Sequence, residues 1–251
     1  MDNYELNKLK VKNIVAFILG ILLLSLGPYL FLLPVLINSG VLHSSASSFI
    51  NIIVANSSVI TVQAEVVGIG LSILFFENEL FYDMRQFRHK WGKYILIIII
   101  GFGLLFLFSR LYDYIYSIVG VSPDSENQEI VYMSLTGNIK LLSIISVCII
   151  APIFEELVFR KFAYGYLKNT KMPLFMTVFI VAFMFAIIHC SGEDFATAQS
   201  WLYLSNYFIL SLVITVSYVY TDNIYVPIAI HMLNNIYSIL LFYSALSIVH
   251  V

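Results

Sequence analysis

The stretch "LLSIISVCIIAPIFEELVFRKF" (141–162) decides the fold, because it opens with a long uncharged apolar run and carries charge only near its end. A membrane-spanning helix needs about 20 mostly apolar residues. Of the 251 residues in the chain, 60% are hydrophobic and 11% are charged, whereas soluble domains have roughly 25% charged residues. The sequence therefore predicts an all-α, polytopic transmembrane protein.

Apolar stretches predict about seven spans, and one missed break would make eight. The second span is the least certain in kind, because its Ser, Asn and Glu65 fit either a partial loop or a helix that lines a lumen. The first apolar stretch is too long for the apolar region of a signal peptide and is interpreted as a span. The expected spans lie near 13–37, 49–76, 93–118, 138–160, 173–191, 200–220 and 224–247.

The charges of the connecting segments alternate along the chain. Segments 85–93 and 160–171 are basic, whereas segments 122–129 and 191–195 are acidic. Cytoplasmic loops carry an excess of Lys and Arg, so the pattern predicts a multi-pass protein of the cell membrane with a cytoplasmic N-terminus. The net charge of −2 and the absence of a long basic run argue against a nucleic-acid partner. The bilayer is the expected surrounding, and the oligomeric state is not predicted.

Two adjacent glutamates and an arginine lie in this apolar context. Glu156 and Arg160 are four residues apart, on one face of a helix, with the acid in the favourable N-terminal position. Glu155 lies about 100° around the helix from Glu156, so the two carboxylates face different surroundings. We expect Arg160 to neutralise Glu156 and Glu155 to face a cavity. Pro152, which removes a helical hydrogen bond to Cys148, is expected to kink the helix just before the glutamates.

Three further polar residues lie on later predicted spans. His189 follows an apolar run, and His231 and Asn235 share one helix face. A carboxylate and an imidazole that hold one water form a general-base pair, which Glu155 and His189 could supply. His231 and Asn235 are hydrogen-bond donors suited to an oxyanion. Each feature also has a structural interpretation: a neutralised ion pair, a satisfied interhelical histidine, or an asparagine that joins helices.

Three motifs in order resemble a known family. "EELVFR" (155–160) fits EExxxR, "FAIIH" (185–189) fits FxxxH, and "HMLNN" (231–235) fits HxxxN. Together they are similar to the CPBP family, the CAAX protease and bacteriocin-processing (Abi) intramembrane endopeptidases. The resemblance covers roughly 138–247. It implies that 1–137 holds N-terminal helices and loops, and that 138–247 is the catalytic core of one integrated membrane domain.

The resemblance implies a helical bundle with a cavity in its C-terminal half, reached from the cytoplasm or the bilayer. It implies hydrolysis of a peptide bond in a membrane-associated peptide or protein, with water activated by Glu155 and His189. His231 and Asn235 would stabilise the oxyanion. Glu156, Arg160 and Phe185 would support the architecture. The expected roles are those of bacterial members: peptide maturation, bacteriocin immunity or surface-protein processing.

Metal dependence is left open by the sequence. Glu155, His189 and His231 could supply three zinc ligands, but there is no HExxH motif. A metal-free, glutamate-type mechanism is favoured, because Asn235 is a good oxyanion donor and a poor zinc ligand. Two alternatives belong to other classes. The same fold could bind a partner without catalysis, or the buried ionisable groups could form a relay in a small transporter. A transporter predicts inverted repeats, and none is visible.

Overall fold

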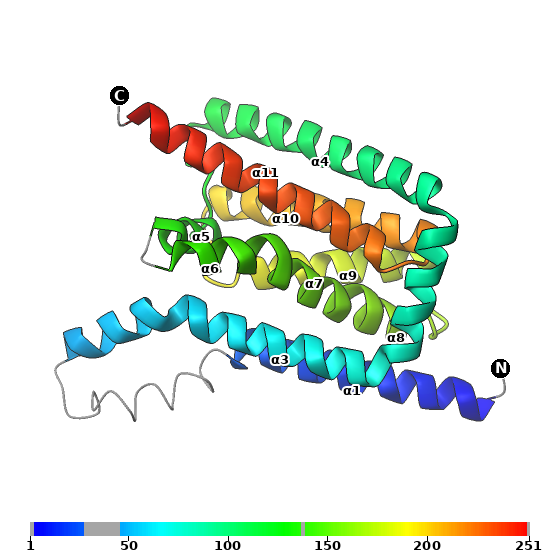
Figure 1. Ribbon diagram of the computed structural model, residues 1–251. Helices are drawn as coiled ribbons and strands as arrows, with labels where there is room; N and C mark the ends of the chain where they lie inside the picture. The colour runs from blue at the N-terminus through cyan, green and yellow to red at the C-terminus, as the bar shows by residue number, and fades with distance from the viewer. Residues whose placement is uncertain (1–2, 28–45, 137–138, 250–251) are drawn as a thin grey trace.

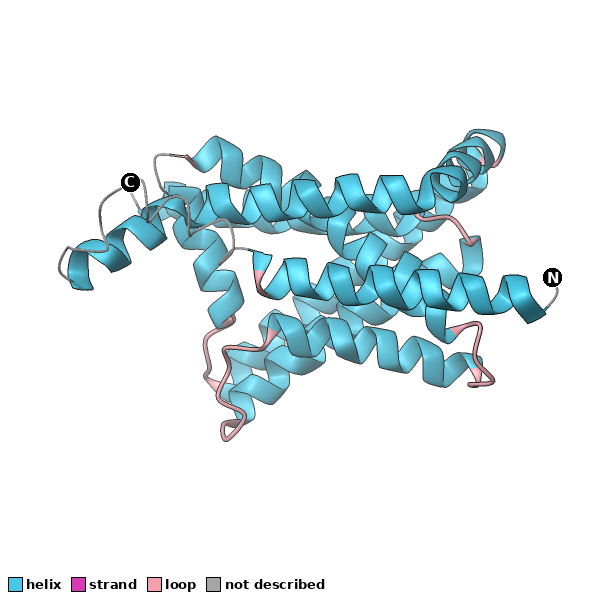
Figure 2. Ribbon diagram, turned by 90° about the horizontal axis from the view of Figure 1, so that it is seen from below, coloured by secondary structure: helices cyan, strands magenta, loops and turns pink. Residues whose placement is uncertain are grey.

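The computed structural model describes residues 3–27, 46–136 and 139–249, and these residues form helices and loops without a strand (Figures 1 and 2). The predicted all-helical fold is therefore confirmed. Residues 140–167 form one continuous helix, called here the central helix, which alternates between α-helical and π-helical turns. The other helices are α1 (Asn3–Ser25), α3 (Ala46–His89), α4 (Trp91–Val119), α5 (Glu126–Thr136), α9 (Leu174–His189), α10 (Ala198–Thr221) and α11 (Tyr225–Val249).

Five of the described helices are long and apolar enough to cross a membrane, and two shorter helices are also apolar. The chain is thus a membrane protein. The predicted span 49–76 differs from the structure at both ends, because α3 begins at Ala46 and continues to His89. The helix bends at Phe76, which has φ −128° and ψ 22°. Part of the basic segment 85–93 is therefore helical. Part of the predicted first span, 28–37, lies outside the described residues.

The acidic segment 122–129, expected to be a loop, leads into the short helix α5. Glu126 and Glu129 lie in the first turn of α5, where the helix dipole favours negative charge. The sequence of α5 contains no long apolar run, so the hydropathy pattern does not predict this helix.

The basic and acidic segments lie at opposite ends of the bundle. The start of α1, the α3–α4 corner and the α10–α11 connection lie at one end, whereas α5 and the C-terminal end of α11 lie at the other (Figure 1). Ion pairs hold the basic end together: Lys161 Nζ lies 2.8 Å from Asp83 Oδ2, and Lys168 Nζ lies 3.5 Å from Asp222 Oδ1. Basic and acidic connecting segments therefore lie at opposite ends of the fold, as the charge pattern predicts. Which end faces the cytoplasm remains a prediction.

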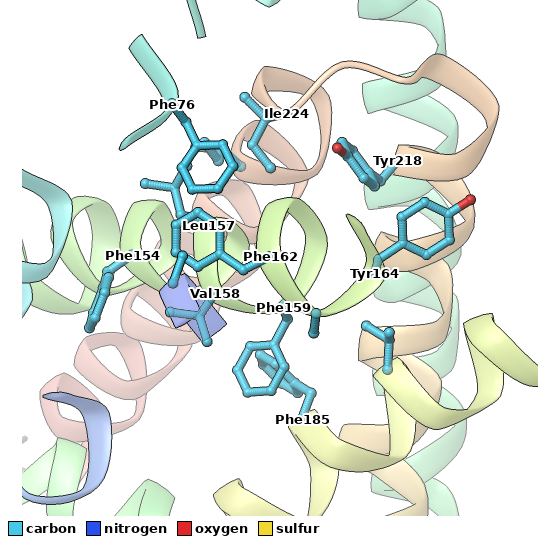
Figure 3. Packing of buried hydrophobic residues seen from close by; sticks show 14 of the residues in the cluster. Phe76, Phe154, Leu157, Val158, Phe159, Phe162, Tyr164, Phe185, Tyr218 and Ile224 are labelled. Carbon is cyan, nitrogen blue, oxygen red and sulfur yellow. The ribbon is translucent and has the colours of Figure 1, made fainter. Parts of the chain in front are cut away.

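The core forms around the second half of the central helix (Figure 3). Phe154, Leu157, Phe159 and Phe162 of this helix are at most 2% exposed, and the rings of Phe76 and Phe162 stack with centroids 4.7 Å apart. Lipid tails are as apolar as these side chains, so dispersion contacts and close packing stabilise such a core.

Two small residues allow the N-terminal helices to approach the central helix. A Cβ atom added to Gly20 of α1 would lie 2.6 Å from Val158 Cγ2, and one added to Gly68 of α3 would overlap the ring of Phe154. Small residues at helix interfaces permit such contact in membranes. The N-terminal helices are thereby packed directly against the helix that carries the two glutamates.

Candidate active site

The central helix changes its hydrogen-bond register just before the two glutamates. Residues Ser146–Ile150 are π-helical, and the N–H of Ala151 donates to the carbonyl of Ser146, five residues earlier. The next residue, Pro152, has no N–H to donate. The carbonyl of Val147 therefore lacks the backbone donor that would continue the π register.

A side chain from α11 replaces that missing donor. Asn235 Nδ2 donates to the carbonyl of Val147 at 2.9 Å, and Asn234 Nδ2 lies 3.4 Å from Asn235 Oδ1. We expected Pro152 to leave the carbonyl of Cys148 unpaired, as in an α-helix. The π register moves that effect to Val147. An amide has two N–H groups, and Asn235 also lines the cavity.

Glu156 and Arg160 form the ion pair that their spacing predicts. Arg160 Nη1 donates to Glu156 Oε1 at 3.0 Å, and both side chains are fully buried. Arg160 Nη2 also donates to the backbone oxygen of Ser211 at 3.2 Å and to its hydroxyl at 2.8 Å. The same carboxylate oxygen of Glu156 lies 2.8 Å from His231 Nδ1, a contact that the sequence does not predict. The buried pair thus holds both an arginine and a histidine.

Glu155 points elsewhere, as the helix geometry predicts. Its side chain is 15% exposed and lines a cavity. Glu155 Oε2 lies 3.7 Å from His189 Nε2 and 3.8 Å from His231 Nε2. The three motifs therefore contribute to one cluster, although 34 or more residues separate Glu155 from either histidine in the sequence.

The backbone sets the tautomer of His189. Its Nδ1 lies 2.9 Å from the carbonyl oxygen of Phe185, and because a carbonyl can only accept, Nδ1 carries the proton. In a neutral ring, Nε2 then has a lone pair. The Phe185 ring stacks on the His189 ring with centroids 4.0 Å apart and packs edge-on against His231 at 5.8 Å. The expected supporting residue Phe185 thus touches both histidines.

Glu155 Oε2 and neutral His189 Nε2 are both acceptors, so they cannot bond to each other directly. Their separation of 3.7 Å exceeds a hydrogen bond and suits a shared water. Such a water would donate one proton to each acceptor, which leaves its oxygen lone pairs directed at a substrate. This arrangement can activate water for attack.

His231 faces the same site with a different electrostatic partner. Its Nδ1 donates to the Glu156 carboxylate, so its Nε2 carries a proton only when the ring is an imidazolium. The Glu156 carboxylate lies next to such a charged ring. His231 can therefore donate to an oxyanion while Glu156 compensates its charge.

The cavity has a volume of about 1230 Å³ and is lined by all four predicted site residues: Glu155, His189, His231 and Asn235. It is not confined to the C-terminal half, because α1, α3 and α4 also contribute lining residues. From the site it extends along α5 and the segment 123–125, which belong to the acidic end of the bundle.

This direction differs from the expected access. The resemblance implies entry from the cytoplasm or the bilayer, whereas the cavity leads toward the end that the charge pattern predicts to be outside. Asp113 and Asp124 line its outer part. Burial, followed by the nearby carboxylates of Glu129 and Asp113, raises the pKa of Asp124.

Three residues of this region were not assigned roles by the sequence. Ser211 on α10 holds Arg160. Tyr207, also on α10, places its ring 5.1 Å from that of His189 and accepts a hydrogen bond from Asn127 at 3.2 Å. Glu65 on α3 lines the cavity and accepts from Ser146 Oγ at 3.0 Å. A charged residue within an apolar stretch was a usable signal for Glu65, but ordinary Ser and Tyr residues gave none.

The zinc alternative requires the three side chains to move slightly closer together. Ligand atoms about 2.1 Å from a tetrahedral zinc lie about 3.4 Å apart, and Glu155 Oε2 lies 3.7 and 3.8 Å from the two histidine Nε2 atoms. Within the described residues, no group of three or more His, Cys, Asp or Glu side chains is arranged to hold a metal ion. The metal-free mechanism stays a prediction.

Comparison with known proteins places these motifs in a family. Residues 137–237 match the family described as type II CAAX prenyl endopeptidase Rce1-like. The resemblance to the CPBP family is confirmed. All three CPBP motifs fall within the matched segment, and so do the four predicted site residues.

Two curated bacterial proteins are similar to this chain. The membrane-embedded CAAX protease MroQ of Staphylococcus aureus is 32% identical over 153 residues, which cover 57% of this chain and 56% of MroQ. The UPF0177 protein YvdC of Lactococcus lactis is 32% identical over 147 residues, which cover 58% of this chain and 52% of YvdC. The chain thus spans about half the length of the curated relatives it matches. No solved structure matches it.

Proposed function

We propose that this chain is an intramembrane endopeptidase that hydrolyses a peptide bond of a membrane-associated peptide or protein. The observation that carries the proposal is the convergence of Glu155, His189 and His231 in one cavity, with Nε2 of each histidine within 4 Å of Glu155 Oε2. Buried ionisable groups in membranes mark functional sites. The match of residues 137–237 to an endopeptidase family adds support.

In the proposed reaction, Glu155 and His189 hold a water and Glu155 accepts its proton as the oxygen attacks the peptide carbonyl. The carbonyl oxygen becomes negative and accepts hydrogen bonds from His231 and Asn235. Glu155 then returns the proton to the leaving amine. The Glu156 carboxylate lies between Arg160 and His231 and accepts a hydrogen bond from each.

We further propose that the protein resides in the cell membrane with a cytoplasmic N-terminus, because the basic segments gather at the end where α1 begins. The cavity then receives its substrate from the outer side or from the bilayer. Peptide maturation, bacteriocin immunity and surface-protein processing are the expected contexts. All three involve peptides or proteins at the membrane.

The activity is tested with purified protein in lipid vesicles and a library of membrane-spanning peptides, with products identified by mass spectrometry. We expect wild-type protein to produce defined cleavage products and a His189→Ala variant to produce none. A protein that binds peptides but cleaves none would favour the non-catalytic, partner-binding alternative. Identical products from both proteins would indicate a contaminating protease.

A second experiment concerns the metal. We expect a strong chelator to leave the cleavage rate unchanged, because the proposed water is held by a carboxylate and an imidazole. The rate is measured before and after incubation with 1,10-phenanthroline, with a known zinc protease as the positive control. Full inhibition that zinc reverses would contradict the metal-free mechanism.

A further inference from the structure

Glu65 is a buried carboxylate that the proposed reaction does not use. It lies on α3, outside the segment matched to the family, and is 6% exposed. It lines the same cavity as Glu155. Its Oε2 accepts a hydrogen bond from Ser146 Oγ at 3.0 Å, and no Lys, Arg or His among the described residues bonds to it.

The cavity around Glu65 contains more acidic than basic side chains. Four carboxylates line it: Glu65, Asp113, Asp124 and Glu155. Among the described residues, the only Lys or Arg in the lining is Arg110, whose Nη2 lies 2.8 Å from Asp113 Oδ2. Of the other three, Glu155 lies near His189 and His231, whereas Glu65 and Asp124 have no ion pair with a cation among the described residues. An ionisable group at this depth is costly unless it is paired or wet, and a positively charged ligand would provide the pairing.

The position of Glu65 relative to Glu155 follows from the central helix. Ser146, which touches Glu65, precedes Glu155 by nine residues on that helix. At 1.5 Å per residue this corresponds to about 13 Å along the helix. An extended peptide advances about 3.3 Å per residue, and a Lys or Arg side chain adds reach of its own. A basic side chain bound at Glu65 would therefore belong to a residue roughly two to four positions from the cleaved bond.

We propose that Glu65 binds a lysine or arginine side chain of the substrate and thereby selects peptides with a basic residue near the scissile bond. This inference rests on the proposed function, since it assigns a substrate class to the same cavity. It also gives the N-terminal helices a role in selecting substrate. If Glu65 served only as the acceptor for Ser146, its replacement would affect the binding of all peptides equally.

The test uses fluorescent membrane-spanning peptides of identical sequence that differ at one position, which is Lys in one peptide and Gln in the other. We expect wild-type protein in detergent to bind the Lys peptide at least tenfold more tightly. Glu65→Gln keeps an oxygen that can accept from Ser146 but removes the carboxyl group that could form an ion pair with the substrate. It should abolish the preference and leave binding of the Gln peptide unchanged. Glu129→Gln, on an exposed position of α5, should retain the preference.

Two results would overturn the inference: an unchanged Lys preference in Glu65→Gln, or an equal loss of binding for both peptides, which indicates a structural role. Cleavage of the same peptides separates this inference from the proposed function. A Lys preference that depends on Glu65, without any cleavage, would support the binding site and count against the protease. Cleavage without a Lys preference would support the protease and count against the binding site at Glu65.

Discussion

A Glu155→Gln protein is expected to insert and fold like the wild type and to cleave its substrate at least ~100-fold more slowly, the usual range for loss of a general base. Glutamine has nearly the same shape but cannot accept the proton of the attacking water. Stability should change little, because Glu155 is in contact with the cavity and neither histidine lies within hydrogen-bond distance of it. Cleavage rate and unfolding temperature are measured on the same purified sample.

The matched control for this variant is Glu129→Gln, which removes an equivalent charge from an exposed position at the acidic end. It should cleave at the wild-type rate. If purified Glu155→Gln cleaves a confirmed substrate normally, Glu155 is not the general base. A lowered unfolding temperature in Glu155→Gln would instead assign the lost activity to the fold.

Arg160→Met is expected to reduce protein abundance and thermal stability severely. The Arg160 guanidinium and the Glu156 carboxylate are both fully buried, and removing one partner of a buried ion pair typically costs about 3–5 kcal/mol. The carboxylate of Glu156 would remain in the core with only His231 as a partner. Abundance in membranes and the unfolding temperature in detergent measure the effect.

A double variant distinguishes the stabilising role from the catalytic one. Replacing a buried pair by apolar residues of similar volume is often neutral or stabilising, so Glu156→Leu combined with Arg160→Met should restore abundance. Activity should stay low, because His231 Nδ1 loses its acceptor. Normal abundance of the single Arg160→Met variant with lost activity would contradict the neutralising role and assign Arg160 to the catalytic group.

The sequence predicts the helical fold and the local geometry of the site well, because both depend on short-range periodicity. The ion pair of Glu156 with Arg160 follows from a spacing of four residues. The separation of Glu155 from that pair follows from the angle between adjacent residues on a helix. The placement of basic and acidic segments at opposite ends follows because each apolar helix carries the chain from one end of the bundle to the other.

The contacts that complete the site could not be predicted in the same way. His231 and Glu156 are 75 residues apart, and Ser146 and Glu65 are 81 residues apart, so only the packing of helices brings them together. The π-helical turns shift the faces of the central helix relative to an ideal α-helix. The direction of the cavity depends on α5, a helix without an apolar run.

The bond between Asn235 and Val147 affects how a mutational scan of this site must be interpreted. Truncation of Asn235 removes an oxyanion donor and also leaves the Val147 carbonyl without its donor, so a single alanine variant combines two losses. Pro152→Ala gives the backbone back an N–H next to that carbonyl. The effect of Asn235→Ala, measured alone and in combination with Pro152→Ala, therefore divides the lost activity into a chemical part and a part due to helix distortion.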